Sequence, residues 1–193
     1  MAAPAFVAFI SVLAGQTLAA YGFCLIALVC LIFFRDPERS FTTEKGAVIS
    51  PADGKIVYLS GEGGEGFKLS IFMSPWDVHI NRAPVDSVVT HVEYIPGRFQ
   101  AAYEMKASVE NERNALTLQM DDGNKVVIIQ VAGVLARRIV CRARLGDRLS
   151  KGERYGLIRF GSRVDLILPP DFAPRVKYGD RVRAGQTTLG ILP

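Results

Sequence analysis

The sequence predicts a mainly β protein, in which a compact β domain with an internal repeat follows an N-terminal hydrophobic helical membrane anchor. Residues 5–34 contain no charged residue, whereas the remainder of the 193-residue chain has the composition of an ordinary globular domain. From residue 46 onward, short apolar runs alternate with turn-forming residues, and no segment after residue 40 keeps a helical period beyond a turn or two. We therefore expect an anchor over residues 1–36 and a β domain over residues 37–193.

The charge-free segment reads "AFVAFISVLAGQTLAAYGFCLIALVCLIFF". A secretory signal peptide has an apolar region of about 7–15 residues, and a spanning helix needs roughly 20, so the segment favours membrane attachment over a signal peptide or a buried core helix. One tilted span and a re-entrant hairpin that turns at Gly15-Gln16 both fit. Arg35 and Arg39 follow directly, and basic residues concentrate on the cytoplasmic side of membranes. The β domain is therefore expected in the cytoplasm.

The net charge of +4 comes largely from one segment, "ARRIVCRARLGDRLSKGER" at residues 136–154. In a membrane-attached protein such a segment suits an anionic membrane surface, and a basic face without a partner is the alternative. No nucleic-acid-binding motif accompanies it. The three cysteines, Cys24, Cys30 and Cys141, have neither C-x-x-C spacing nor a histidine cluster nearby, so we predict no disulfide framework and no metal site.

Short strands and tight turns account for the β domain. The turn Pro-Ala-Asp-Gly joins two apolar runs, Pro96-Gly97 ends another, and Asp122-Gly123 lies near the tip of a hairpin. The segments with this pattern are "GAVISPADGKIVYL", "FKLSIFMS", "VVTHVEYI" and "ALTLQMDDGNKVVIIQVAGVL".

An internal repeat links two further segments, "GDRLSKGERYGLI" at 146–158 and "GDRVRAGQTTLGIL" at 179–192. Both contain Gly-Asp-Arg, a second glycine and a short apolar strand, which places tight turns between strands. The units resemble those of the hammerhead β-folds of biotinyl and lipoyl carrier domains, a resemblance that implies pseudo-twofold β structure. No lysine occupies a carrier-like hairpin tip between them, which weakens a carrier function. A non-catalytic, membrane-tethered hammerhead binding module is one alternative function.

The chain contains two histidines, so candidates for a general base are few. His91 lies on the face of an alternating strand, where a structural or surface role is expected. His79 lies in "MSPWDVHINRAPVDS", a polar, proline-bounded stretch in which Asp77, Asn81 and Arg82 are close in sequence. Functional residues gather on loops held by a rigid scaffold, so His79 is the candidate base.

Gly161 and Ser162 interrupt the strand-like run "LIRFGSRVDLILPP". Composition alone favours a bulge or a tight bend at this step. Ser162 lacks the G-x-S-x-G context of a hydrolase nucleophile, but a spatial arrangement of serine, histidine and carboxylate stays open, with Asp53 of "PADG" as the carboxylate.

Five motifs occur in the order found in phosphatidylserine decarboxylase proenzymes: "FFRDPER", "SPADGKI", "SPWDVHINRAP", "YIPGRF" and "GERYGLIRFGSRVDLILP". The chain resembles the short bacterial form of this family from about Phe33 to its end. The resemblance implies a bacterial inner-membrane enzyme, with its catalytic domain on the cytoplasmic face, that converts phosphatidylserine to phosphatidylethanolamine. A related serine phospholipid is the alternative substrate, and homo-oligomer formation stays open.

The resemblance also implies self-processing. In the family, the serine hydroxyl, here that of Ser162, attacks the carbonyl of the preceding Gly161. The ester formed then eliminates to dehydroalanine, which hydrolyses to a pyruvoyl group. Residues 1–161 would become the β chain and residues 162–193 the α chain. By the same analogy His79 is the base and Asp53 orients it. The pyruvoyl ketone would form a Schiff base with the substrate amine and accept the electrons released by decarboxylation, with no diffusible cofactor or metal.

The chain departs from the family pattern at two positions. Longer members carry two histidines three residues apart, and here the first matches His79 whereas the second position is Arg82. The duties of two imidazoles therefore fall on His79 alone or are shared with Arg82, Asn81 or water. In addition, Arg163 replaces the threonine that usually follows Gly-Ser.

Overall fold

The computed structural model describes residues 6–7, 9–10, 17–61, 66–100, 110–134, 138–159 and 161–193. The chain divides into two compact units, Met1–Pro37 and Glu38–Pro193. The first contains the apolar helix α2 (Thr17–Phe33). Within the described ranges, no helix has both the length and the hydropathy that crossing a membrane requires. The turn predicted at Gly15-Gln16 lies outside the described residues.

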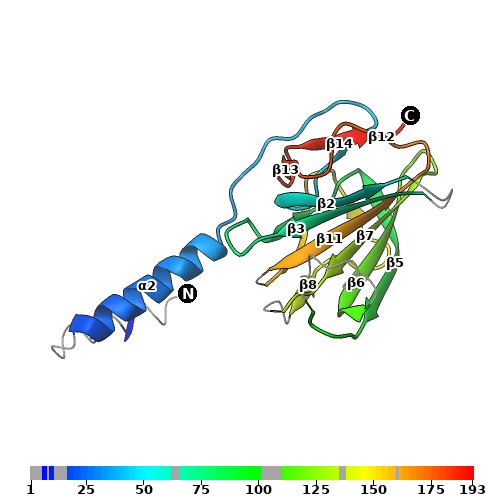
Figure 1. The fold of residues 1–193 in the computed structure, drawn as a ribbon. Coiled ribbons are helices and arrows are strands. Elements are labelled where there is room, and N and C mark those ends of the chain that lie inside the picture. The colour runs from blue at the N-terminus through cyan, green and yellow to red at the C-terminus, as the bar shows by residue number, and fades with distance from the viewer. Residues whose placement is uncertain are drawn as a thin grey trace. The chain divides into compact units, whose positions relative to one another are not determined.

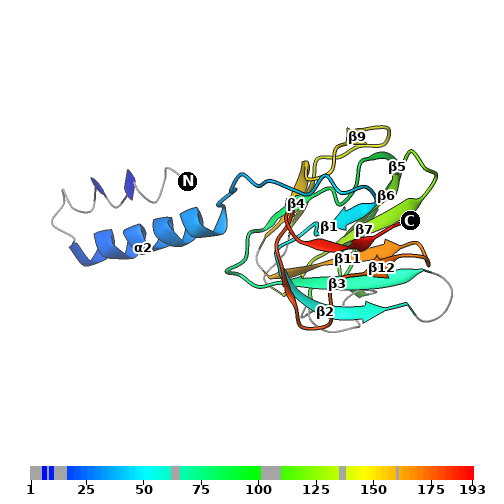
Figure 2. The same cartoon turned by 90° about the horizontal axis from the view of Figure 1, so that it is seen from above.

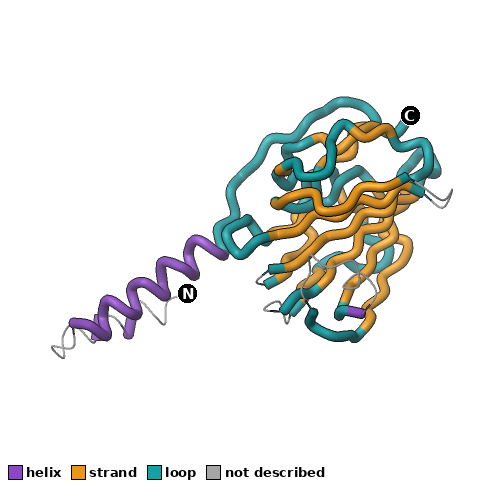
Figure 3. The backbone as a smooth tube through the Cα atoms, in the orientation of Figure 1, coloured by secondary structure: helices purple, strands orange, loops and turns teal. Residues whose placement is uncertain are grey.

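The second unit is built mainly of strands, which confirms the predicted mainly β class (Figure 3). Its strands, in chain order, are β1 (Ala47–Ile49), β2 (Gly54–Ser60), β3 (Phe67–Met73), β4 (Ile80–Arg82), β5 (Ser87–Ile95), β6 (Arg113–Gln119), β7 (Lys125–Val131), β8 (Ile139–Cys141), β9 (Arg148–Leu149), β10 (Arg154–Ile158), β11 (Ser162–Leu168), β12 (Ala173–Pro174), β13 (Arg181–Val182) and β14 (Thr188–Ile191).

These strands form one large sheet and two small ones, and every pairing between named strands is antiparallel. The eight-stranded sheet has the order β13-β2-β3-β11-β7-β6-β5-β9 and is strongly curled (Figures 1 and 2). The small sheets have the orders β1-β14-β12 and β4-β10-β8. The predicted hairpin with Asp122-Gly123 near its tip is confirmed as the β6–β7 pair.

Strand β11 lies in the middle of the large sheet, between β3 and β7. All of its residues except Ile167 are buried, so it is a central strand covered on both faces. Its first residue, Ser162, lies opposite Met73, the last residue of β3. Because the pair is antiparallel, the loop that follows β3 leaves the sheet at the edge where the chain enters β11.

The two Gly-Asp-Arg repeats fold in the same way. Each runs through a turn, a two-residue strand, a second turn and a longer strand, giving β9 and β10 in the first repeat and β13 and β14 in the second. Asp147 and Asp180 each accept a hydrogen bond from the backbone N–H three residues earlier, at 2.7 and 2.9 Å. The aspartate of each repeat therefore closes its own turn.

Tyr155 of β10 is a polar residue enclosed by the core. Its side chain is about 1% exposed, and its hydroxyl has no hydrogen-bond partner among the described residues. Burial raises the pKa of Tyr155 well above the ordinary 10.0, and the nearby Cys141 adds to the rise. The ionised form is thus excluded from the folded protein.

This burial predicts a loss of stability at high pH. Above pH 10 the unfolded chain releases the Tyr155 proton and the folded chain keeps it, so the free energy of unfolding falls by about 1.4 kcal/mol per pH unit from this group. Tyr155→Phe should remove that part of the slope in urea titrations at pH 9 to 11. Tyr178→Phe, at an exposed position, is the control. Equal slopes in the wild type and Tyr155→Phe would contradict the account.

Candidate active site

The Gly161–Ser162 step lies at the entrance to β11. Gly161 has a φ of +63°, in the left-handed region, and a Cβ added to it would meet no atom within 4 Å. Glycine is therefore favoured here by backbone conformation and not by crowding. Ser162 is fully buried, and its Oγ donates a hydrogen bond to Sδ of Met73 at 3.5 Å.

His79 reaches this step from the loop between β3 and β4. The loop is closed by Asp77, whose side chain accepts from the N–H of Ser74 at 2.8 Å and whose own N–H donates to the carbonyl of Ser74 at 3.0 Å. The imidazole of His79 is 2% exposed; its Nδ1 lies 2.9 Å from the carbonyl oxygen of Asp77 and its Nε2 lies 3.4 Å from the N–H of Gly161. The structure thus brings His79, Gly161 and Ser162 together.

These two contacts assign the tautomer of His79. A carbonyl oxygen can only accept, so Nδ1 carries the proton that is donated to Asp77. A backbone N–H can only donate, so Nε2 presents its lone pair toward Gly161. The imidazole is therefore held with its unprotonated Nε2 next to Gly161, the residue that precedes Ser162.

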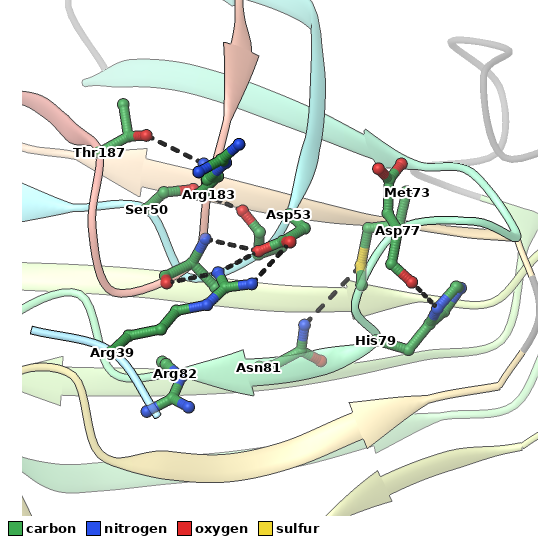
Figure 4. A network of polar contacts seen from close by, with 12 residues as sticks. Arg39, Ser50, Asp53, Met73, Asp77, His79, Asn81, Arg82, Arg183 and Thr187 are labelled. Carbon is green, nitrogen blue, oxygen red and sulfur yellow. Dashed lines mark hydrogen bonds and ion pairs between the residues drawn. The ribbon is translucent and has the colours of Figure 1, made fainter. Parts of the chain in front are cut away.

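Asp53 does not occupy the position expected for it. Both carboxylate oxygens bind the guanidinium of Arg39, and Oδ1 also accepts from the N–H of Ala184 at 2.8 Å. His79, which Asp53 is expected to orient, donates from Nδ1 to the carbonyl of Asp77 instead (Figure 4). The predicted contact between Asp53 and His79 is thus corrected, because a bidentate arginine is the stronger partner for a buried carboxylate.

Arg39 is the residue at this site that the sequence reasoning missed as a site residue, although it lies within the "FFRDPER" motif. Besides Asp53 it binds the carbonyl of Ala184 at 2.8 Å. Its side chain is 8% exposed and that of Asp53 is 12% exposed. Arg39 therefore ties together three segments that are distant in sequence: the start of the second unit, the "PADG" turn and the C-terminal segment.

Two further arginines near the site face away from solvent. Arg82 donates to the carbonyl of Gly152 at 3.1 Å and is buried. Arg163 is 1% exposed, and its Nε lies 2.8 Å from Oδ1 of Asp165, two residues along the same strand. The arginine that replaces the family's threonine thus forms a buried ion pair inside β11.

The Arg39–Asp53 pair should contribute strongly to stability. Arg39→Met would leave the Asp53 carboxylate buried without its charged partner, which typically costs about 3–5 kcal/mol. Urea unfolding in an uncleaved Ser162→Ala background measures this loss. Arg175→Met, which breaks the exposed pair with Glu44, should cost at most about 1 kcal/mol. Equal losses in the two variants would show that burial does not set the strength of the Arg39 contact.

Comparison with known proteins identifies the family of the chain. Residues 26–190 match the family model described as phosphatidylserine decarboxylase. A phosphatidylserine decarboxylase proenzyme of Geotalea uraniireducens is 47% identical over 189 residues, covering 95% of this chain and 88% of that protein. Proteins of the same name from Geobacter metallireducens and Ralstonia nicotianae are 47% and 48% identical, over 89% and 90% of this chain and 81% and 83% of their own lengths. The chain belongs to the phosphatidylserine decarboxylase family.

Proposed function

We propose that this protein is a proenzyme that cleaves itself between Gly161 and Ser162 and then decarboxylates phosphatidylserine to phosphatidylethanolamine. The observation that carries the proposal is the lone pair of His79 Nε2 directed at the Gly161–Ser162 step, in a chain of this family. The relatives are named as proenzymes, which supports a cleavage that precedes activity.

Cleavage uses groups that the chain itself supplies. Nε2 of His79 takes the proton of Ser162 Oγ as the oxygen attacks the carbonyl carbon of Gly161. The peptide bond to Ser162 breaks, and its nitrogen takes the proton back from His79, which leaves an ester between Gly161 and Ser162 Oγ. Nε2 of His79, again unprotonated, then takes the Cα proton of Ser162, the Cα=Cβ double bond forms, and the Cβ–Oγ bond breaks to release Gly161 as a carboxylate. The dehydroalanine takes up water and loses ammonia, which leaves a pyruvoyl group.

The surroundings of Ser162 fit that group. The side chain is fully buried, and its hydrogen-bond partner is the thioether of Met73, a weak acceptor and a good apolar neighbour. Conversion of the serine CH2OH group to the methyl group of pyruvoyl would therefore give up only this weak hydrogen bond to Met73. A ketone at the start of β11 supplies an electron sink for the carbanion left when CO2 departs. The contact of His79 Nε2 with Gly161 supports a role for His79 in returning a proton to that carbanion.

We also propose a location for the protein in the cell. The charge-free run at residues 5–34 and the arginines that follow it support attachment to the bacterial inner membrane, with the β domain on the cytoplasmic face. The basic segment supports contact with an anionic membrane surface through the exposed Arg138, Arg142 and Arg144. Arg148 and Arg154 of that segment have acidic partners in the ion pairs with Asp121 and Glu38, and Arg137 lies outside the described residues.

A hammerhead arrangement of the two Gly-Asp-Arg repeats belongs to the same proposal. Their common order of turn, two-residue strand, turn and strand supports it. Each repeat contributes to a different small sheet, with β10 beside β4 and β8, and β14 beside β1 and β12. In this arrangement the repeats form the scaffold of the enzyme.

Ser162→Ala tests the cleavage. The variant should remain a single chain of 193 residues, because the attacking oxygen is absent. The wild type should give a chain of residues 1–161 and a 32-residue chain whose blocked N-terminus resists Edman degradation. Intact-mass measurement distinguishes the two. A wild-type protein that stays uncleaved and carries no ketone would instead support a binding module.

His79→Ala tests the base. Loss of a general base typically slows a reaction by about 10²–10⁴-fold, so conversion of precursor to the two chains should slow by at least about 100-fold. His91→Ala is the matched control, because His91 is exposed on β5 and outside the contacts of Ser162. Quantitative gel analysis of newly synthesised protein gives both rates. Processing of His79→Ala at the wild-type rate would place the base elsewhere.

A further inference from the structure

Strand β4 identifies which neighbour of His79 faces the site. Successive side chains of a strand point to opposite faces, so Asn81 and Arg82, both of β4, point to opposite faces. Arg82 uses its face to bind the carbonyl of Gly152. Figure 4 shows Asn81 pointing toward Met73, with Arg82 directed away. Asn81, and not Arg82, therefore stands beside the cleavage site.

The carboxamide of Asn81 is held in one orientation. Its Oδ1 accepts from Nε2 of Gln130 at 2.9 Å, and Oε1 of Gln130 accepts from Nδ2 of Asn114 at 3.4 Å. Asn81 and Gln130 are fully buried, and Asn114 is 5% exposed. This ladder of three carboxamides leaves Nδ2 of Asn81 facing Sδ of Met73 at 3.8 Å.

The donor of Asn81 is poorly matched in the uncleaved chain. An amide NH2 group carries two hydrogens, and a thioether is a weak acceptor. Leaving a buried donor without a good acceptor costs about 1–3 kcal/mol, so buried donors in native proteins normally have one. A poorly matched donor beside a reacting serine can be explained if a better acceptor forms there during the reaction.

Met73 locates that acceptor. Its Sδ accepts from Ser162 Oγ at 3.5 Å and from Asn81 Nδ2 at 3.8 Å, so both polar atoms lie within 4 Å of one sulfur. We propose that Asn81 Nδ2 donates a hydrogen bond to Ser162 Oγ as this oxygen leaves in the carboxylate of Gly161. The inference rests on the proposed function and assigns a donor to its elimination step.

The charge balance of that step explains why a donor is needed. The base removes the Cα proton of Ser162, the electron pair forms the Cα=Cβ bond, and the pair of the Cβ–Oγ bond remains on the leaving oxygen. Negative charge therefore develops at Oγ inside a buried site. The thioether of Met73 cannot donate to it, whereas the amide of Asn81 can, and a donor aimed at developing charge lowers the barrier.

Asn81→Leu tests the inference because it keeps the approximate shape and removes the donor. Ester formation should proceed, and elimination should slow by about 100-fold, the usual loss for one such donor. The ester then accumulates. Hydroxylamine cleaves it and releases a 32-residue chain that begins with a readable Ser162, whereas completed processing gives a blocked chain. Edman degradation with and without hydroxylamine separates the two products over time.

Two matched variants control for structure. Asn114→Leu removes a buried carboxamide at the far end of the same ladder and should not accumulate ester. Gln130→Leu frees the orientation of Asn81 and should accumulate ester to a smaller extent. If Asn81→Leu does not fold, Asn81→Ala carries the same test, because the methyl group of alanine cannot donate a hydrogen bond.

The outcomes separate this inference from the proposed function. A wild type without a blocked chain of residues 162–193 contradicts the function itself. If the wild type processes normally, two results for the Asn81 variant would overturn only the role of Asn81. One is processing at the wild-type rate, and the other is a block before the ester forms. Ester accumulation in Asn114→Leu equal to that in Asn81→Leu would also overturn it, because the effect would then belong to the ladder as a whole.

Discussion

The antiparallel register between β3 and β11 is the constraint on which the site depends. It sets Ser162 opposite Met73, at the point where one strand ends and the other begins. The loop after β3 therefore returns His79 to the entrance of β11, although the two residues are far apart in sequence. A shift of one residue in this register would turn Ser162 to the other face of the sheet and separate it from Met73. The large sheet, with β11 at its centre, holds this register along seven paired positions.

Burial is the second feature that shapes the chemistry. Ser162, His79 and Asn81 are each at most 2% exposed, so charge that develops there must be met by protein groups. Two buried carboxylates of the domain are already paired with arginines, Asp53 with Arg39 and Asp165 with Arg163. Two neutral groups lie next to the neighbours of Ser162: the imidazole of His79 contacts Gly161, and the carboxamide of Asn81 contacts Met73. This division keeps fixed ion pairs in the scaffold and leaves neutral groups at the reacting atoms.

Local sequence patterns predicted much of the fold and part of the candidate site. Alternation and turn residues predicted the strands, and the polar loop around His79 marked the residue that reaches Gly161. The partner of Asp53 was mispredicted because a carboxylate binds whichever strong donor the fold delivers, and Arg39 arrives from outside the turn. The role proposed for Asn81 depends on the face of β4 to which its side chain points and on its hydrogen bond with Gln130 of β7. A sequence motif shows neither of these. The burial of Arg163 could not be predicted from the sequence, because it depends on the central position of β11 in the sheet. On this strand, which is covered on both faces, Arg163 pairs with Asp165.

The central claim is that the chain makes its own ketone at residue 162. Borohydride reduction in the presence of a short-chain phosphatidylserine, followed by mass analysis of the separated chains, tests it most directly. A substrate adduct is expected on the 32-residue chain of residues 162–193 and none on residues 1–161. An adduct on the larger chain, or an unmodified 193-residue chain, would contradict it.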